Sequence, residues 1–170
     1  INATDRPYEK DNKTVALTKG TLTFTGLAGS ETLDVSIPAT GTISDARAGT
    51  YTVTFTGVTL ADGTGKADNY TLNAALPAVT VNITRATAPA LADITVSQKY
   101  TATTGEKAIG SVMPADAGTL TYTAGSSSVT GTATVSSFTV DSTGMVKYTI
   151  TGGADGAVIT LPVIIGSDNY

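Results

Sequence analysis

The stretch Tyr51-Thr52-Val53-Thr54-Phe55-Thr56 alternates apolar and hydroxyl side chains with a period of two residues. Successive side chains of an extended strand point to opposite faces, so the two aromatic residues and the valine share one face and the threonines share the other. Threonine suits a solvated face, because its β-branch favours extended backbone while its hydroxyl stays hydrated. The stretch therefore predicts a strand with one face in a core and one in water.

The same alternation recurs along the whole chain, and no window of helical length shows the spacing of an apolar helix face without Gly or Pro. Short turn signals separate the segments. One of them, Asp141-Ser142-Thr143-Gly144, predicts a β-hairpin between 138–140 and 145–151. Many short strands joined by turns are typical of a sandwich, so we expect an all-β fold with almost no helix. The further alternating segments are 21–25, 33–37, 79–84 and 146–151.

The segment 85–90 is small, contains a proline and lacks large apolar side chains, which is typical of a linker. We therefore expect two tandem small β-sandwich (Ig-like) domains, 1–85 and 86–170. Asp68-Asn69-Tyr70 recurs as Asp168-Asn169-Tyr170. In the first half a further strand, 79–84, follows this triplet. We therefore expect the second domain to lack its closing strand.

Composition excludes several classes of function. The 170 residues include no Cys, His or Trp, and 46 of them, about 27%, are Thr or Ser. Without Cys and His there is no Ser-His-Asp machinery, no usual zinc or haem site and no disulfide, so we expect no enzyme, no catalytic residue, no metal site and no cofactor. The net charge of −4 without a basic run argues against nucleic acid. No apolar run reaches the ~18–20 residues of a membrane span, so we expect no membrane insertion of this segment.

Two tyrosines, Tyr8 and Tyr70, are the candidate ligand-binding residues, since exposed rings could stack on sugars. The competing interpretation puts each ring in the sandwich core with its hydroxyl at the rim. The loop 61–69 carries oxygen ligands of the type that Ca²⁺ takes, in Asp62 and Asp68. Because it lacks the EF-hand spacing and Lys66 would repel the cation, we interpret it as a solvated turn.

Two further site types have weak support. An intramolecular Lys–Asn crosslink needs its partners buried together, whereas alternation places Lys147 toward water. Lys99, Lys107 and Asn82 are no better placed. A glycosidase needs two carboxylates across a cleft, and nothing in the sequence brings two together. The acidic residues considered are Glu9, Asp11, Glu31 and Asp45.

Three segments of the sequence are Ala3-Thr4-Asp5-Arg6-Pro7-Tyr8-Glu9-Lys10-Asp11-Asn12-Lys13-Thr14, Ala67-Asp68-Asn69-Tyr70-Thr71-Leu72 and Val81-Asn82-Ile83-Thr84. Together they resemble a known family, the YDG domain, over roughly residues 3–85. Glu9 and Lys10 stand where the family's name motif has Asp and Gly, whereas Tyr8 matches. Residues 91–170 resemble a companion repeat of such modules through 113–119 and 165–170.

The resemblance implies a repeat segment of a bacterial cell-surface or secreted adhesin-like protein, located outside the cell or on its wall. Its expected role is that of a structural stalk, and its expected partners are neighbouring repeats of the same chain. The alternative is a module that binds a host glycan or surface protein. A third interpretation is an accessory domain of a secreted enzyme. The family carries no catalytic residues over to this sequence.

Overall fold

The computed structural model describes residues 1–72, 76–99, 101 and 104–170. The chain divides into two compact units, Ile1–Ala86 with Asn169, and Thr87–Asp168 with Tyr170. Within the described ranges the sole helical element is a single 3-10 turn, Ala67–Asn69, and the other elements are strands. The all-β prediction is therefore confirmed. None of the helices in that part of the chain combines the length and apolar character needed to cross a bilayer.

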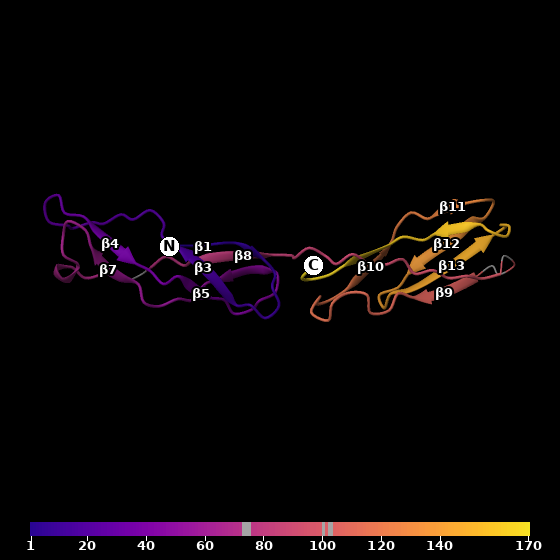
Figure 1. The fold of residues 1–170 in the computed structure, drawn as a ribbon, viewed down its shortest axis with the longest axis horizontal. Helices are drawn as coiled ribbons and strands as arrows, with labels where there is room; N and C mark the ends of the chain where they lie inside the picture. Colours follow the sequence, from indigo (N-terminus) through magenta and orange to yellow (C-terminus); the bar gives the residue numbers. More distant parts are fainter. Residues whose placement is uncertain (73–75, 100, 102–103) are drawn as a thin grey trace. The chain divides into compact units, whose positions relative to one another are not determined.

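The first unit contains two three-stranded sheets and one two-stranded sheet. The chain starts in the first sheet and crosses at once to the second, so its N-terminal run contributes a short strand to each. The indigo N-terminal end of the chain lies beside the first sheet (Figure 1). The first sheet has the order β1 (Asn2–Ala3), β3 (Thr14–Thr18), β5 (Thr40–Thr42); the second has the order β2 (Arg6–Pro7), β8 (Thr80–Thr84), β6 (Gly49–Thr52); the third pairs β4 (Leu33–Ser36) with β7 (Thr59–Asp62).

The core of the first unit follows from the alternation in its strands. In β3 and β8 the burial pattern is exposed-buried-exposed-buried-exposed, with every threonine on the exposed face. Val15, Val81 and Ile83 are at most 2% exposed. Gly41 in β5 is needed for close packing, because a Cβ there would lie 2.5 Å from Cγ1 of Val53. Burial at these positions is the main source of stability, at ~1.5–3 kcal/mol for each large aliphatic side chain.

The faces predicted for 51–56 are confirmed: Tyr51, Val53 and Phe55 are buried or half-buried and the three threonines are exposed. The regular strand β6 ends at Thr52, and an antiparallel bridge between Thr42 and Thr54 extends the pairing. The prediction of a strand at 21–25 is wrong, since no described residue pairs with this segment in a ladder. It alternates correctly, but a strand also requires a free neighbouring edge to complete its backbone hydrogen bonds.

The second unit has one three-stranded sheet and two ribbons. The predicted hairpin is confirmed, with Val140 opposite Val146 and Gly144 at φ +78° in the turn. The segment 91–99, ahead of the first strand, is exposed and belongs to no sheet. The sheet has the order β12 (Thr134–Val140), β13 (Met145–Thr151), β9 (Thr104–Ala108); the ribbons pair β10 (Thr121–Ala124) with β15 (Val163–Gly166) and β11 (Ser128–Thr130) with β14 (Val158–Thr160).

Candidate functional site

Tyr8, the first candidate tyrosine, lies directly after β2 and is 8% exposed. Its backbone N–H donates to the carbonyl oxygen of Thr84 at 2.7 Å, which continues the β2–β8 pairing by one residue. A ring that is buried to this extent has no open face on which a sugar could stack. The position of Tyr8 therefore favours the core interpretation over the binding interpretation.

Tyr70, the second candidate, is half-buried next to the 3-10 turn, and it connects two loops. Its hydroxyl accepts a hydrogen bond from the Ala28 N–H at 3.0 Å and donates a short one to the Glu31 carboxylate. Glu31 was considered above only as a possible catalytic acid, and this pairing was not predicted from the sequence. Both polar functions of the hydroxyl are used inside the fold, so the ring is fixed in place.

A second set of contacts joins the same loops. The Thr32 N–H donates to Oγ1 of Thr64 at 2.8 Å, and the Thr64 N–H donates to Oγ1 of Thr32 at 3.1 Å. The loops approach so closely that a Cβ at Gly63 would lie 2.3 Å from the carbonyl oxygen of Thr32. We call Glu31, Thr32, Thr64 and Tyr70 the loop clamp. Its chemistry is hydrogen bonding within the protein, which holds the β4–β7 end of the unit together.

The loop 61–69, considered above for Ca²⁺, satisfies its acidic side chain internally. The Asp62 carboxylate accepts from Nζ of Lys66 at 2.7 Å and from the Ala67 N–H at 2.8 Å. Lys66, followed by the Ala67 N–H, lowers the pKa of Asp62, and Asp62 in turn raises the pKa of Lys66. The part of the chain that the structure describes holds no group of three or more His, Cys, Asp or Glu side chains placed to bind a metal ion.

The acidic residues considered for a glycosidase and the residues considered for a crosslink have separate partners or exposed positions. Of the candidate acids, Glu31 belongs to the loop clamp, Glu9 accepts from Nδ2 of Asn12, and Asp45 pairs with Arg47 at 3.1 Å. Asp11 lies in the turn that follows Tyr8, at φ +58°. The residues considered for a crosslink all lie on exposed positions, namely Asn82, Lys99, Lys107 and Lys147.

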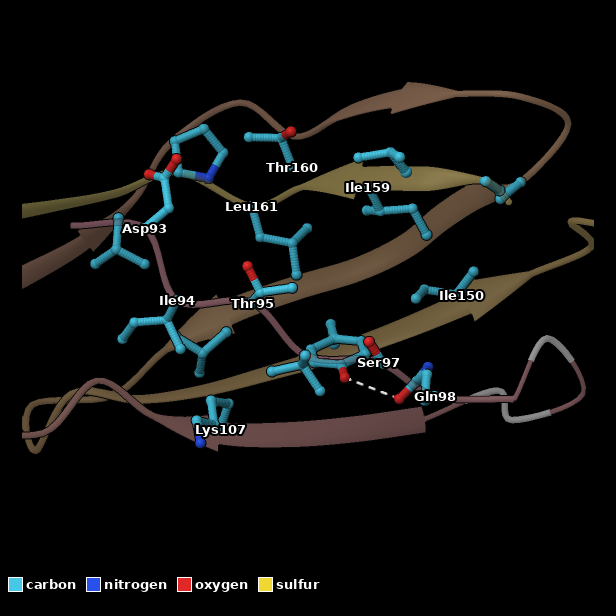
Figure 2. A pocket seen from close by; sticks show the side chains of 18 of the residues that line it. Asp93, Ile94, Thr95, Ser97, Gln98, Lys107, Ile150, Ile159, Thr160 and Leu161 are labelled. Atoms are coloured by element: carbon cyan, nitrogen blue, oxygen red, sulfur yellow. Dashed lines mark hydrogen bonds between the residues drawn. The ribbon is translucent and has the colours of Figure 1, made fainter. Parts of the chain in front are cut away.

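The second unit contains a cavity of about 930 Å³ that sequence analysis did not predict. Its lining is mainly aliphatic, and Figure 2 shows Ile94 and Thr95 crossing it, with Leu161, Ile159 and Ile150 around them. On the β9 side, the ring of Tyr148 lies over Gly105, and its hydroxyl donates to Oε1 of Gln98 at 2.9 Å. The side chains of the strands therefore do not fill the space between the sheet and the ribbons.

This cavity leaves apolar surface uncovered. Leu91, Ile94 and Val96, on the segment that crosses it, are 44–46% exposed. Within the described residues β15 is paired along one edge only, to β10. The lining combines aliphatic side chains with polar ones, among them Asp93, Gln98 and Lys107. Such a lining can accept the aliphatic groups of a ligand and also offers polar partners to orient it. The expectation of a missing closing strand stays a prediction.

Comparison with known protein families supports the resemblance noted for the first half of the chain. The family model described as YDG domain matches residues 1–79. This stretch contains all of the first unit up to Val79 and includes both candidate tyrosines. Searches of curated proteins and of solved structures gave no significant match. The likeness of residues 91–170 to a companion repeat stays a prediction.

Proposed function

Because the chain carries a YDG domain over residues 1–79, we propose that it is a structural segment of an adhesin-like protein on the bacterial surface, acting as a stalk that holds other regions away from the cell. One observation carries the proposal: the polar groups at the candidate sites of the first unit hold its own fold. The Tyr70 hydroxyl, the Glu31 carboxylate and the Asp62 carboxylate all bond inside the protein. Strand faces of threonine keep such a segment hydrated along its length.

The location is tested with antibodies raised against residues 1–170. Intact cells of the source organism should be labelled, and external protease should remove the labelling. An antibody against a cytoplasmic protein serves as the control for cell integrity. Labelling only after lysis would contradict the proposal.

A binding module is the second candidate, and the cavity of the second unit is the observation that favours it. Its lining of aliphatic side chains interspersed with polar ones suits the mixed side chains of a protein ligand. The probe is a peptide with the sequence of residues 78–86, whose alternating valines and isoleucine fill the core of the first unit. Saturable binding to the full chain that is lost in Ile159→Asp and kept in Ile164→Asp, on the exposed face of β15, would support this candidate.

A further inference from the structure

The second and the last strands of the first unit, β2 and β8, lie side by side and run in the same direction. Arg6 of β2 is opposite Ile83 of β8, and Pro7 is opposite Thr84, in a parallel pair. Tension along the chain pulls β2 toward its N-terminal end and β8 toward its C-terminal end. In a parallel pair these two forces lie along the strands and point in opposite directions, so the strands can separate only by sliding.

From this geometry we propose that the β2–β8 pair is a shear clamp that makes the first unit resist extension, an inference that rests on the proposed stalk function. Sliding loads all bonds between the strands together. Two strands pulled apart from one end instead lose their bonds one after another. Since forced unfolding is governed by the rate of crossing the unfolding barrier, the direction of loading changes the force at which the same contacts break.

The contacts across the pair extend beyond its two-residue register. The Tyr8 N–H donates to the Thr84 carbonyl oxygen at 2.7 Å, and the Asn82 N–H donates to Oδ1 of Asp5 at 2.8 Å. Pro7 has no N–H to donate. The hydrogen bond that the Asp5 carboxylate accepts adds a contact ahead of the short strand. The clamp therefore spans residues 5–8 on one strand and 82–84 on the other.

Both strands are anchored against the rest of the unit. On its other edge β8 pairs with β6 from Gly49↔Ile83 to Thr52↔Thr80, and Val81 and Ile83 are at most 2% exposed. The Arg6 guanidinium donates to the carbonyl oxygens of Asn12 and, at 3.3 Å, of Thr14, which ties β2 to the turn ahead of β3 and to the first residue of β3. Sliding β2 would also draw the buried Tyr8 ring out of the core.

The test is single-molecule pulling of the full chain, which has no native Cys and so accepts handles at chosen positions. In the shear geometry, one handle is a cysteine added ahead of Ile1 and the other is Thr87→Cys. In the peeling geometry, the handles are Lys10→Cys and Thr87→Cys, both beyond the C-terminal ends of the paired strands. Lys10 and Thr87 are exposed. The rupture force should be at least about twofold higher in the shear geometry; equal forces would overturn the clamp.

A matched pair of variants tests the hydrogen bond that the Asp5 carboxylate accepts from the Asn82 N–H. Asp5→Ala should lower the rupture force in the shear geometry and leave the peeling force unchanged, whereas Asp68→Ala, an exposed acid outside the sheets, should change neither. A fall in both geometries would mean that the bond stabilises the unit without bearing load, and would remove Asp5 from the clamp.

The clamp and the stalk function can fail separately. Equal shear and peeling forces combined with surface labelling would refute the clamp alone. A higher force in the shear geometry without surface labelling would refute the stalk alone.

Discussion

The Tyr70 hydroxyl bonds to Glu31 and Ala28, which precede Tyr70 by 39 and 42 residues in the sequence. Tyr70→Phe keeps the ring but leaves the carboxylate and the Ala28 N–H without this partner. We expect the free energy of unfolding of the first unit to fall by about 1–2 kcal/mol. Urea denaturation of the full chain measures it.

Tyr51→Phe is the matched control, because within the described residues the Tyr51 hydroxyl makes no hydrogen bond that would be lost. It should change the free energy of unfolding by less than about 0.5 kcal/mol. If the two variants were equally stable, the hydroxyl of Tyr70 would contribute nothing to the loop clamp.

Asp11 adopts a backbone conformation that L-residues rarely take, with φ +58°, in a turn closed by the Asn12 N–H and the Glu9 carbonyl oxygen at 3.1 Å. Glycine reaches this region without steric cost. Relief of the left-handed conformation, worth about 1–2 kcal/mol, should exceed the entropic cost of glycine, about 0.5–1 kcal/mol. Asp11→Gly should therefore raise the free energy of unfolding by about 0.5–1 kcal/mol, measured by urea denaturation. Lys10→Gly, in the same turn but without a positive φ, should not stabilise the unit. A loss of stability in Asp11→Gly would show that the aspartate side chain matters more than the backbone strain.

Among the elements, the β12–β13 hairpin depends on one carboxylate at its turn. Oδ1 of Asp141 accepts from the Thr143 hydroxyl at 2.6 Å, the Thr143 N–H at 2.9 Å and the Met145 N–H at 3.0 Å. The Thr143 hydroxyl, followed by the two N–H groups, lowers the pKa of Asp141 below its ordinary value of 3.8. A lowered folded pKa means that the ionised carboxylate stabilises the folded state above the ordinary pKa, and that this stabilisation is lost as the pH falls through the folded pKa.

The expected result is a loss of stability of the second unit on acidification below about pH 4 that is shallower in Asp141→Asn than in the unmodified chain. Thermal unfolding followed at several pH values measures the slope. Asp155→Asn, in an exposed loop, is the matched control and should leave the slope unchanged. A slope in Asp141→Asn equal to that of the unmodified chain would contradict the assignment.

The alternation of side chains predicted which face of a strand is buried. It failed where the formation of a strand depends on a neighbouring strand with a free edge. The segments 51–56 and 146–151 place their side chains on the expected faces. The segment 21–25 alternates equally well but forms no strand, because periodicity reports the side chains and carries no information about a free sheet edge. The partner of Tyr70 was also beyond prediction. Glu31 lies 39 residues away, and only the fold brings their loops together.

Over the whole molecule, the two units are filled to very different extents. Eleven of the described buried apolar residues belong to the first unit and three, Ala117, Val146 and Tyr148, to the second. The second unit also contains the cavity of about 930 Å³. Stability scales with buried apolar surface, so we infer that the second unit is the less stable of the two.

The two cores should therefore respond differently to the same kind of truncation. Ile83→Ala removes side-chain atoms from a site that is 2% exposed and should cost about 2–4 kcal/mol. Ile159→Ala borders a cavity that already exists, so fewer packing contacts are lost and the cost should be below about 1.5 kcal/mol.

Hydrogen exchange measured by mass spectrometry on the full chain resolves the units separately. Amides of β13 and β15 should exchange faster than those of β6 and β8, and Ile83→Ala should speed exchange in the first unit alone. Uniform protection of both units, with equal costs for the two truncations, would mean that the second core is as closely packed as the first.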